Sequence, residues 1–275
     1  MANNNEKLIG IIGYPLKQSL SPLLHNYWIE KNNINAHYTA FTISKLKNIN
    51  KAIKVLNIKG LNVTIPYKKK IIKYLDEIEI TAERMGAVNT ILNVKGRLKG
   101  YNTDIYGFKQ GLDYFKKWDK EKPVVIIGAG GAAESAIYAL IKISCKQVYV
   151  MNRTLSKSKK LADKYKNVNI AKWLSYDIIN QAGLIINTTS LGMIGYPNLQ
   201  LNLKDTLKDL KVYDVVYNPL DTGLIKEAKI RGLDYMSGLT MFLGQAQKSF
   251  NLWFNKSPII DKALLKLLHQ HLKLK

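Results

Sequence analysis

The sequence of 275 residues contains a single cysteine, few arginines and few acidic side chains. Because Cys145 stands alone, no internal disulfide is possible, and we expect a protein of the reducing cytoplasm. Long hydrophobic runs are also missing, since glycine, proline and polar residues interrupt the longest uncharged stretch, from Asp177 to Lys204. We therefore expect no membrane-spanning helix and no membrane partner. The polar first residues and the short apolar run at 8–12 do not predict a signal peptide.

The sequence also lacks a recognisable set of metal ligands. The four histidines, His25, His37, His269 and His271, show no metal-ligand spacing with Cys145. We therefore expect no metal site.

The scarcity of acidic residues leaves 42 Lys and Arg against 20 Asp and Glu, a formal net charge of +22. Such an excess at first suggests a nucleic-acid or anionic-surface partner. However, 38 of the basic residues are lysines, whereas arginine is prominent in contacts with phosphates and base edges. The lysines are spread along the whole chain, with only short clusters at 68–70 and 157–160, and 24 asparagines accompany them. We expect a compositional bias of the source genome and no nucleic-acid partner.

The composition and the pattern of apolar residues indicate a globular α/β protein. Hydrophobic residues make up 47% of the chain and charged residues 23%, the balance of a soluble globular protein of one large domain or two ordinary ones. In the first hundred residues, short apolar runs alternate with amphipathic segments, which predicts an α/β domain. The expected strands are 8–12, 36–42, 60–65 and 87–94, and the expected helices are 21–31, 45–56, 69–75 and 77–85.

The second half has a clearer pattern. Residues 123–127 are apolar throughout, as in a strand buried on both faces, and lead through a glycine-rich turn to a helix at 134–143 and a strand at 147–151. The alternation continues, which predicts an open parallel sheet with helices on both faces. The remaining strands are expected at 168–171, 184–187 and 212–216, and the remaining helices at 155–165, 176–181 and 224–231. From Leu239 onward, strand signals are missing, and we expect two helices that fold back on the rest.

The turn Gly128-x-Gly130-x-x-Ala133 has the form G-x-G-x-x-A of a dinucleotide-binding fingerprint. Gly128 permits a tight turn, Gly130 lets the backbone approach the pyrophosphate, and Ala133 permits close packing of helix on strand. The helix N-terminus then offers free N–H groups to the phosphates. The alternative is a plain strand-to-helix turn.

The next strand end indicates which dinucleotide is bound. A site for NAD needs Asp or Glu there to accept a hydrogen bond from the ribose 2′-OH, whereas this chain has Asn152, Arg153 and Thr154. A guanidinium suits a 2′-phosphate, and Lys157 adds a second cation one helical turn later. The sequence therefore predicts NADP; the alternative is a solvated surface arginine.

Polar residues of the first half suggest a site for a small acid. Ser19 and Ser21 stand ahead of a helix, where their hydroxyls can bind a carboxylate, although Ser21 is also a plausible N-cap. Further polar side chains come from the segments 62–68, 86–90 and 102–104, including Lys68 and Asp104. Each of these alone is more often a solvated surface group.

Together these segments resemble the shikimate dehydrogenase family. The similarity covers nearly the whole chain in the right order, in the segments 19–25 (SLSPLLH), 62–68 (NVTIPYK), 86–90 (GAVNT), 102–104 (NTD), 128–132 (GAGGA), 152–154 (NRT), 187–192 (NTTSLG) and 238–246 (GLTMFLGQA). It implies an α/β substrate-binding domain at 1–104, on which the helices of 239–275 pack, and a Rossmann-type NADP domain at 105–238. It also implies the reversible reduction of 3-dehydroshikimate to shikimate by NADPH, on the route through chorismate to the aromatic amino acids.

The resemblance also implies the roles of individual residues. Lys68 and Asp104 would be the catalytic pair, and Ser19 and Ser21 would hold the substrate carboxylate. The other implied substrate-binding residues are Thr64, Asn89, Tyr217 and Gln245. The cofactor-binding residues expected from the motifs and the resemblance are Gly128, Ala129, Gly130, Gly131, Ala132, Asn152, Arg153, Thr154, Lys157, Thr188, Gly238 and Met241.

Two alternatives stay open. The nearer one is a quinate or quinate/shikimate dehydrogenase that uses NAD or either cofactor; Ser21, and Arg153 without an acidic neighbour, favour shikimate and NADP by resemblance. The other is a non-catalytic basic protein that binds nucleic acid through its lysines. We expect a monomer or a homodimer.

Overall fold

The computed structural model describes residues 6–17, 19–115 and 117–273, and the chain forms two compact units. The first unit comprises Met1–Thr103 and Gln245–Lys275, and the second comprises Asp104–Gly244. The boundaries expected from the sequence lay at 104/105 and 238/239, so the second unit is larger by Asp104 and by residues 239–244. Among the described residues, no helix is both long and apolar enough to cross a membrane.

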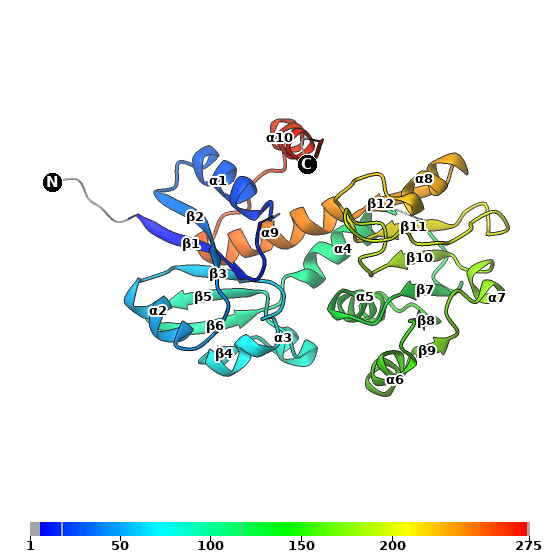
Figure 1. The fold of residues 1–275 in the computed structure, drawn as a ribbon, viewed down its shortest axis with the longest axis horizontal. Coiled ribbons are helices and arrows are strands. Elements are labelled where there is room, and N and C mark those ends of the chain that lie inside the picture. The colour runs from blue at the N-terminus through cyan, green and yellow to red at the C-terminus, as the bar shows by residue number, and fades with distance from the viewer. Residues whose placement is uncertain (1–5, 18, 116, 274–275) are drawn as a thin grey trace. The chain divides into compact units, whose positions relative to one another are not determined.

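A mixed six-stranded sheet is the frame of the first unit (Figure 1). Its order is β2-β1-β3-β5-β6-β4; β1 runs parallel to β2 and β3, and β5 runs antiparallel to β3 and β6. The strands are β1 (Lys7–Gly13), β2 (Ala36–Thr42), β3 (Gly60–Val63), β4 (Glu77–Ile78), β5 (Thr90–Val94) and β6 (Arg97–Tyr101). The helices are α1 (Ser21–Lys31), α2 (Ile49–Val55), the 3-10 helix η1 (Lys70–Tyr74), α3 (Ile80–Met85) and α10 (Lys262–Lys273), together with the C-terminal part of α9 (Gly238–Phe254).

Aromatic side chains attach the C-terminal segment to the first unit. The indole N–H of Trp253 in α9 donates to the carbonyl of Ile91 in β5 at 2.9 Å. The indole N–H of Trp28 in α1 donates to the carbonyl of Ile259 at 3.0 Å. The expected return of the C-terminal helices is therefore confirmed.

The second unit contains a wholly parallel six-stranded sheet of order β12-β11-β10-β7-β8-β9. The predicted parallel sheet is therefore confirmed, although its edge strand β12 was not among the expected strands. The strands are β7 (Val124–Ile127), β8 (Val148–Met151), β9 (Val168–Ala171), β10 (Leu184–Asn187), β11 (Lys211–Asp214) and β12 (Asp234–Ser237). The helices are α4 (Asp104–Tyr114), α5 (Gly131–Lys142), α6 (Leu155–Lys164), α7 (Tyr176–Ile179), α8 (Gly223–Ile230) and the beginning of α9.

Both faces of this sheet are buried, which explains the uninterrupted apolar run of β7. Val124 and Ile126 belong to a core shared with α4 and α5, and Val125 and Ile127 belong to a core shared with α7 and α8. Side chains alternate between the faces of a strand, so a strand covered on both sides needs an apolar residue at every position. The doubly wound arrangement is therefore confirmed (Figure 1).

The sequence-based expectation missed the short strands β4, β6 and β12 and gave 77–85 as one helix. Strand β6 has charged side chains, and Arg97 and Lys99 pair with Glu77 at 2.7 and 3.5 Å. Strand β12 contributes only Met236 to the core. Strands with so few apolar residues have too weak a hydrophobic period to be recognised from sequence.

His25 lies in the middle of an aromatic cluster in the first unit. It is 0% exposed, its ring stacks on Tyr38 with centroids 4.4 Å apart, and Trp253 lies 5.3 Å away. Neither ring nitrogen has a hydrogen-bond partner among the described residues. Burial lowers the pKa of His25 to about 3, and the Asn62 side chain offsets only part of this effect. The imidazole is therefore neutral near pH 7 and packs as an aromatic ring.

We predict that this histidine makes the protein sensitive to acid. In the unfolded chain its pKa returns to about 6.5, so below that value the unfolded state binds a proton that the folded state does not. The free energy of unfolding should fall by about 2 kcal/mol from this residue between pH 7 and pH 5. In urea titrations over this range, His25→Phe should remove that part of the pH dependence. The control Leu24→Ala should lower stability equally at each pH, and an unchanged slope in His25→Phe would contradict the prediction.

Candidate functional site

The glycine-rich turn joins β7 to α5 at the carboxyl edge of the parallel sheet. Gly128 has φ +111°, and a Cβ at this position would come within 2.6 Å of the Thr188 hydroxyl oxygen. Gly130 and Gly131 are exposed, and a Cβ on either would meet nothing within 4 Å. Helix α5 begins at Gly131, three residues earlier than expected, and has no side-chain cap. Its first N–H groups are therefore not capped by a side chain, the arrangement that binds phosphate.

The predicted recognition segment follows β8 at the same edge. Ile127 of β7 is the sheet partner of Met151 of β8, so the two strands end side by side. The Asn152 side chain donates to the carbonyl of Thr154 at 2.8 Å, which holds the turn into α6. Arg153 and Lys157 are exposed, and neither forms an ion pair within the described ranges.

A third strand end completes this edge. Thr188 follows β10, the other neighbour of β7, and both its backbone N–H and its hydroxyl donate to the Ile127 carbonyl at 2.8 Å. The structure thus brings the glycine turn and Thr188 together. Ala129 and Ala132 occupy the same turn, half-buried beside the exposed glycines.

The remaining predicted residues of the second unit lie where β11 and β12 end. The Tyr217 ring stacks on Phe242 of α9 with centroids 5.2 Å apart, and burial raises the pKa of its hydroxyl. The Gly238 N–H donates to the Val216 carbonyl at 3.1 Å, and a Cβ on Gly238 would overlap the backbone of this loop. Met241 is half-buried one turn into α9. Residues 217, 238 and 241 therefore belong to one end of this unit.

In the first unit, the two predicted serines meet at the N-terminus of α1. Ser21 is buried and is the first residue of the helix, and its N–H donates to the Ser19 hydroxyl oxygen at 3.3 Å. The N-cap position is Leu20, without a side-chain cap, so the interpretation of Ser21 as the N-cap is wrong. Both hydroxyls lie at the positive end of the helix dipole, where a carboxylate is favoured.

Asn89 belongs to a buried polar network that joins three strands to α9. Its side-chain oxygen accepts from the Thr103 N–H at 2.7 Å and from the Thr90 hydroxyl at 3.1 Å. The Asn62 amide donates to Thr90 at 3.2 Å and to Ser249 at 3.1 Å. Since buried polar groups must be paired, this network fixes the rotamer of Asn89.

The same network positions two further candidate residues. The Ser249 hydroxyl donates to the carbonyl of Gln245, one turn earlier in α9, at 3.0 Å. Thr103 shares a hydrogen bond of 3.2 Å with Ser249 and directly precedes Asp104, the first residue of α4. Ser249 was missed by the sequence-based analysis, although its spacing of four residues from Gln245 on a helix is a usable signal.

Lys68 and Thr64 come from the turn that follows β3. The Tyr67 N–H donates to the Thr64 carbonyl at 2.8 Å, and the Val88 N–H donates to the Lys68 carbonyl at 2.8 Å. Both candidate side chains are half-buried. The turn is therefore fixed to the segment that carries Asn89. Lys68 belongs to the first unit and Asp104 to the second.

Family models match both halves of the chain. Residues 11–91 match the shikimate dehydrogenase substrate binding domain, and residues 112–194 match shikimate / quinate 5-dehydrogenase. A shikimate dehydrogenase (NADP(+)) of Pelagibacter ubique is 40% identical over 268 residues, which cover 96% of this chain and 99% of that protein. One from Caldanaerobacter subterraneus is 38% identical over 94% of this chain and 97% of that protein.

Solved structures that resemble this chain point to the same family as the sequence comparisons. The crystal structure of shikimate dehydrogenase from Aquifex aeolicus superimposes with a TM-score of 0.89 at 37% identity, over 98% of this chain and 99% of that one. The chain belongs to the shikimate dehydrogenase family. Structures similar to it include the Thermus thermophilus enzyme in complex with NADP(H) and shikimate, with a TM-score of 0.84, 29% identity and coverage of 98% and 99%. They also include a quinate dehydrogenase from Corynebacterium glutamicum in complex with NAD, with a TM-score of 0.89, 28% identity and coverage of 98% and 99%.

The residues at the carboxyl edge of the parallel sheet fit the dinucleotide of this family. The space beside Gly130 and Gly131 at the N-terminus of α5 is open, since a Cβ on either would meet nothing within 4 Å, and a pyrophosphate could approach the N–H groups there. Arg153 and Lys157 supply two cations at the neighbouring strand end. Within the described ranges, no group of three His, Cys, Asp or Glu side chains is arranged to hold a metal ion.

Asp214 is a functional candidate that the sequence-based analysis did not select. Its carboxylate is completely buried at the end of β11 and accepts from Thr222 at 2.6 Å, Asn187 at 2.9 Å and the Val216 N–H at 3.0 Å. Asn187 in turn accepts from the Thr189 N–H at 3.0 Å. The carboxylate therefore joins the loops after β10 and β11 to the start of α8.

Burial raises the pKa of Asp214 to about 6, and the three hydrogen bonds offset only part of this effect. A proton thus binds the folded state more tightly than the unfolded state, whose pKa is near 3.8. The sequence signal was an Asp at the end of an apolar strand, which marks the ligand-binding edge of a parallel sheet.

We predict that stability contributed by Asp214 increases on acidification. Relative to Asp214→Asn, the parent should gain about 1 kcal/mol in free energy of unfolding between pH 7 and pH 5. Urea titrations of both proteins at each pH measure this difference. Thr222→Ser keeps the donor hydroxyl and should retain the parental pH dependence. A parent-to-Asn difference that is constant with pH would be inconsistent with a titrating Asp214.

Proposed function

We propose that this chain is an NADP-dependent shikimate dehydrogenase that reversibly reduces 3-dehydroshikimate to shikimate. The observation that carries the cofactor assignment is Arg153, an exposed guanidinium without an ion-pair partner in the described ranges, on the strand end beside the glycine turn. Family membership at about 40% identity to NADP(+) enzymes supports the same reaction. The product leads through chorismate to the aromatic amino acids.

The substrate would bind to the first unit. We assign its carboxylate to Ser19 and Ser21, whose hydroxyls lie at the positive end of α1. Its ring hydroxyls would be bound by Thr64, Asn89 and Gln245, and Tyr217 would also contact the substrate. Asn89 is well suited because its network holds the amide in one orientation before the substrate arrives, so that little ordering is needed on binding.

Proton transfer is assigned to Lys68 and Asp104. NADPH, when bound, would supply a hydride for the carbonyl carbon, and the carbonyl oxygen would then need a proton from the protein. The Lys68 ammonium would donate this proton during reduction, and the neutral Lys68 amine would accept it back during oxidation. Asp104 would bind a hydroxyl of the substrate and complete the catalytic pair.

The dinucleotide is assigned to the second unit. The turn of Gly128, Ala129, Gly130, Gly131 and Ala132 would bind the pyrophosphate through backbone N–H groups. The 2′-phosphate would contact the segment that follows β8. Its assigned residues are Asn152, Arg153, Thr154 and Lys157. Thr188, Gly238 and Met241 would line the nicotinamide end. Two of these, Thr188 and Gly238, have rigid surroundings, because Thr188 is bonded twice to Ile127 and the position of Gly238 admits no side chain.

We further assign the enzyme to the cytoplasm, where the buried thiol of Cys145 stays reduced, and expect a monomer or homodimer without a nucleic-acid partner.

The competing function is a quinate dehydrogenase that uses NAD, as in the similar structure from Corynebacterium glutamicum. Initial rates with shikimate and quinate, each with NADP and NAD, distinguish the two. Faster turnover of quinate with NAD than of shikimate with NADP would reject the proposal.

For the acid/base pair, we predict that Lys68→Ala lowers kcat by roughly 10² to 10⁴-fold, the usual contribution of general acid–base catalysis. Binding of NADP, followed by fluorescence titration, should change less than twofold. Asp104→Asn should also lose most turnover and should raise the KM for shikimate. Lys51→Ala, an exposed lysine on α2, is the matched control and should retain parental rates. Turnover of Lys68→Ala within threefold of the parent would remove this residue from the mechanism.

For cofactor choice, we predict that Arg153→Ala weakens NADP about ten- to a hundredfold and leaves NAD nearly unchanged. A hydrogen bond to a charged group contributes roughly 1.5 to 3 kcal/mol, and each 1.4 kcal/mol is about tenfold in affinity. The measurement is kcat/KM for both cofactors at fixed ionic strength. Arg84→Ala, an exposed arginine in the first unit, controls for the loss of one charge. An unchanged NADP/NAD ratio in Arg153→Ala would refute the role of this side chain.

A further inference from the structure

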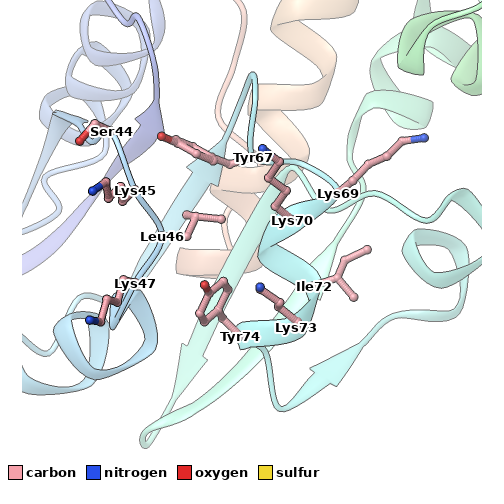
Figure 2. A pocket seen from close by; sticks show the side chains of 10 residues that line it. All are labelled: Ser44, Lys45, Leu46, Lys47, Tyr67, Lys69, Lys70, Ile72, Lys73 and Tyr74. Carbon is pink, nitrogen blue, oxygen red and sulfur yellow. The ribbon is translucent and has the colours of Figure 1, made fainter.

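A hollow of about 530 Å³ in the first unit lies among residues that the proposed function does not use. One wall is the segment after β2, from Ser44 to Lys47, and the other includes Tyr67 and η1 (Figure 2). The lining residues are Ser44, Lys45, Leu46, Lys47, Tyr67, Lys69, Lys70, Ile72, Lys73 and Tyr74. Five of these ten residues are lysines, whereas lysine accounts for 38 of the 275 residues of the chain. Lysine is thus enriched here beyond the general bias of the composition.

The charges in the hollow are not neutralised by acidic side chains. No Asp or Glu lines it. In the described parts of the chain, none of its five lysines forms an ion pair with a carboxylate. Other lysines of this unit do have such partners: Lys54 lies 3.5 Å from Asp76, and Lys99 lies 3.5 Å from Glu77. Like charges that lie close together repel one another, and a bound anion would relieve that repulsion.

The walls are held in place by the core. The Tyr67 hydroxyl donates to the carbonyl of Ile43 at 2.7 Å, which connects the two walls. Tyr67 and Leu46 are only 5% and 7% exposed and belong to the same hydrophobic core as Ile71 of η1. The backbone positions of the lysines are therefore fixed before any ligand binds, which lowers the entropic cost of binding.

Lys70 and Lys73 are the side chains that best define the site. Figure 2 shows both extending from η1 toward the side of the hollow formed by the segment 44–47, whereas Lys69 points away from it. The Lys73 ammonium lies 5.2 Å from the centroid of the Tyr74 ring, a cation–π contact that orients it. Ser44 and Tyr74, whose side chains carry hydroxyl groups, are also among the lining residues.

We propose that this hollow is a binding site for a small anion that carries several phosphate groups, separate from the dinucleotide turn. Several ammonium groups require several negative charges, and lysine binds phosphate as a point charge. The volume is that of a small-molecule pocket, so a compact polyphosphate or a phosphorylated metabolite fits it better than a nucleic-acid backbone.

The test is isothermal titration of the full chain with sodium tripolyphosphate at low, fixed ionic strength. We expect a one-to-one complex whose Kd rises with added salt. In Lys70→Gln with Lys73→Gln, which keeps the aliphatic part of each side chain, Kd should rise at least tenfold. The matched control Lys262→Gln with Lys266→Gln removes the same charge from an exposed face of α10 and should change Kd less than twofold. Thermal melts of both double variants verify that they fold.

Four results would overturn the proposal: no binding by the parent, equal weakening in both double variants, loss of binding only in Arg153→Ala, or binding of a single-stranded oligonucleotide alone. The third would locate the anion at the dinucleotide turn, and the fourth would indicate a nucleic-acid surface. A parallel titration with a nucleoside triphosphate distinguishes a site for inorganic polyphosphate from a site for a phosphorylated metabolite. Equal affinity for both probes indicates recognition of phosphate alone, and tighter binding of the nucleotide indicates added contact with the base. Either result supports the site if the double variant Lys70→Gln with Lys73→Gln binds both probes more weakly than the parent does.

Discussion

The hydrogen bonds of Asp214 at the end of β11 hold together the functional edge of the second unit. An isolated carboxylate in such a position would be costly to bury, and three donors, from Asn187, Val216 and Thr222, offset part of that cost. Because Asn187 ends β10 and Thr222 caps α8, these bonds fix three separate segments at once. The loop that carries Thr188 therefore has a defined position relative to the glycine turn, which a dinucleotide site needs.

In the first unit, the buried polar side chains that link separate segments are neutral. Asn62, Asn89, Thr90, Thr103 and Ser249 are buried and satisfy one another across strands β3 and β5, the end of β6 and helix α9. Such a network is favourable only when all its members are paired, and then it specifies one arrangement of the chain. Of the residues assigned to the substrate, Asn89 and Gln245 are positioned by this network, and the turn of Thr64 is bonded to the segment that carries Asn89. For these residues, substrate recognition and folding depend on the same bonds.

The positive charge of the chain comes partly from dispersed surface lysines and partly from two local groups of basic residues. Most lysines are exposed and dispersed, and they raise the net charge without forming a site. Two local groups differ from this background: Arg153 with Lys157 beside the glycine turn, and the five lysines of the hollow near η1. The first group follows a strand end where a dinucleotide phosphate is expected, and the second surrounds a hollow whose walls are held by buried groups. Geometry, and not net charge, distinguishes a binding site from a basic surface.

The sequence by itself determined the alternating α/β layout, the parallel sheet of the second unit and the family, because these depend on local periodicity and on ordered motifs. A buried strand such as β7 and a turn such as 128–133 have signals within a few neighbouring residues. The edge strands β4, β6 and β12 were missed because they bury too little to be periodic. The Ser249 network, the carboxylate of Asp214 and the lysine hollow were decided only by the tertiary structure. Their members are far apart in the chain, and burial and hydrogen bonding between distant segments arise only when the chain has folded.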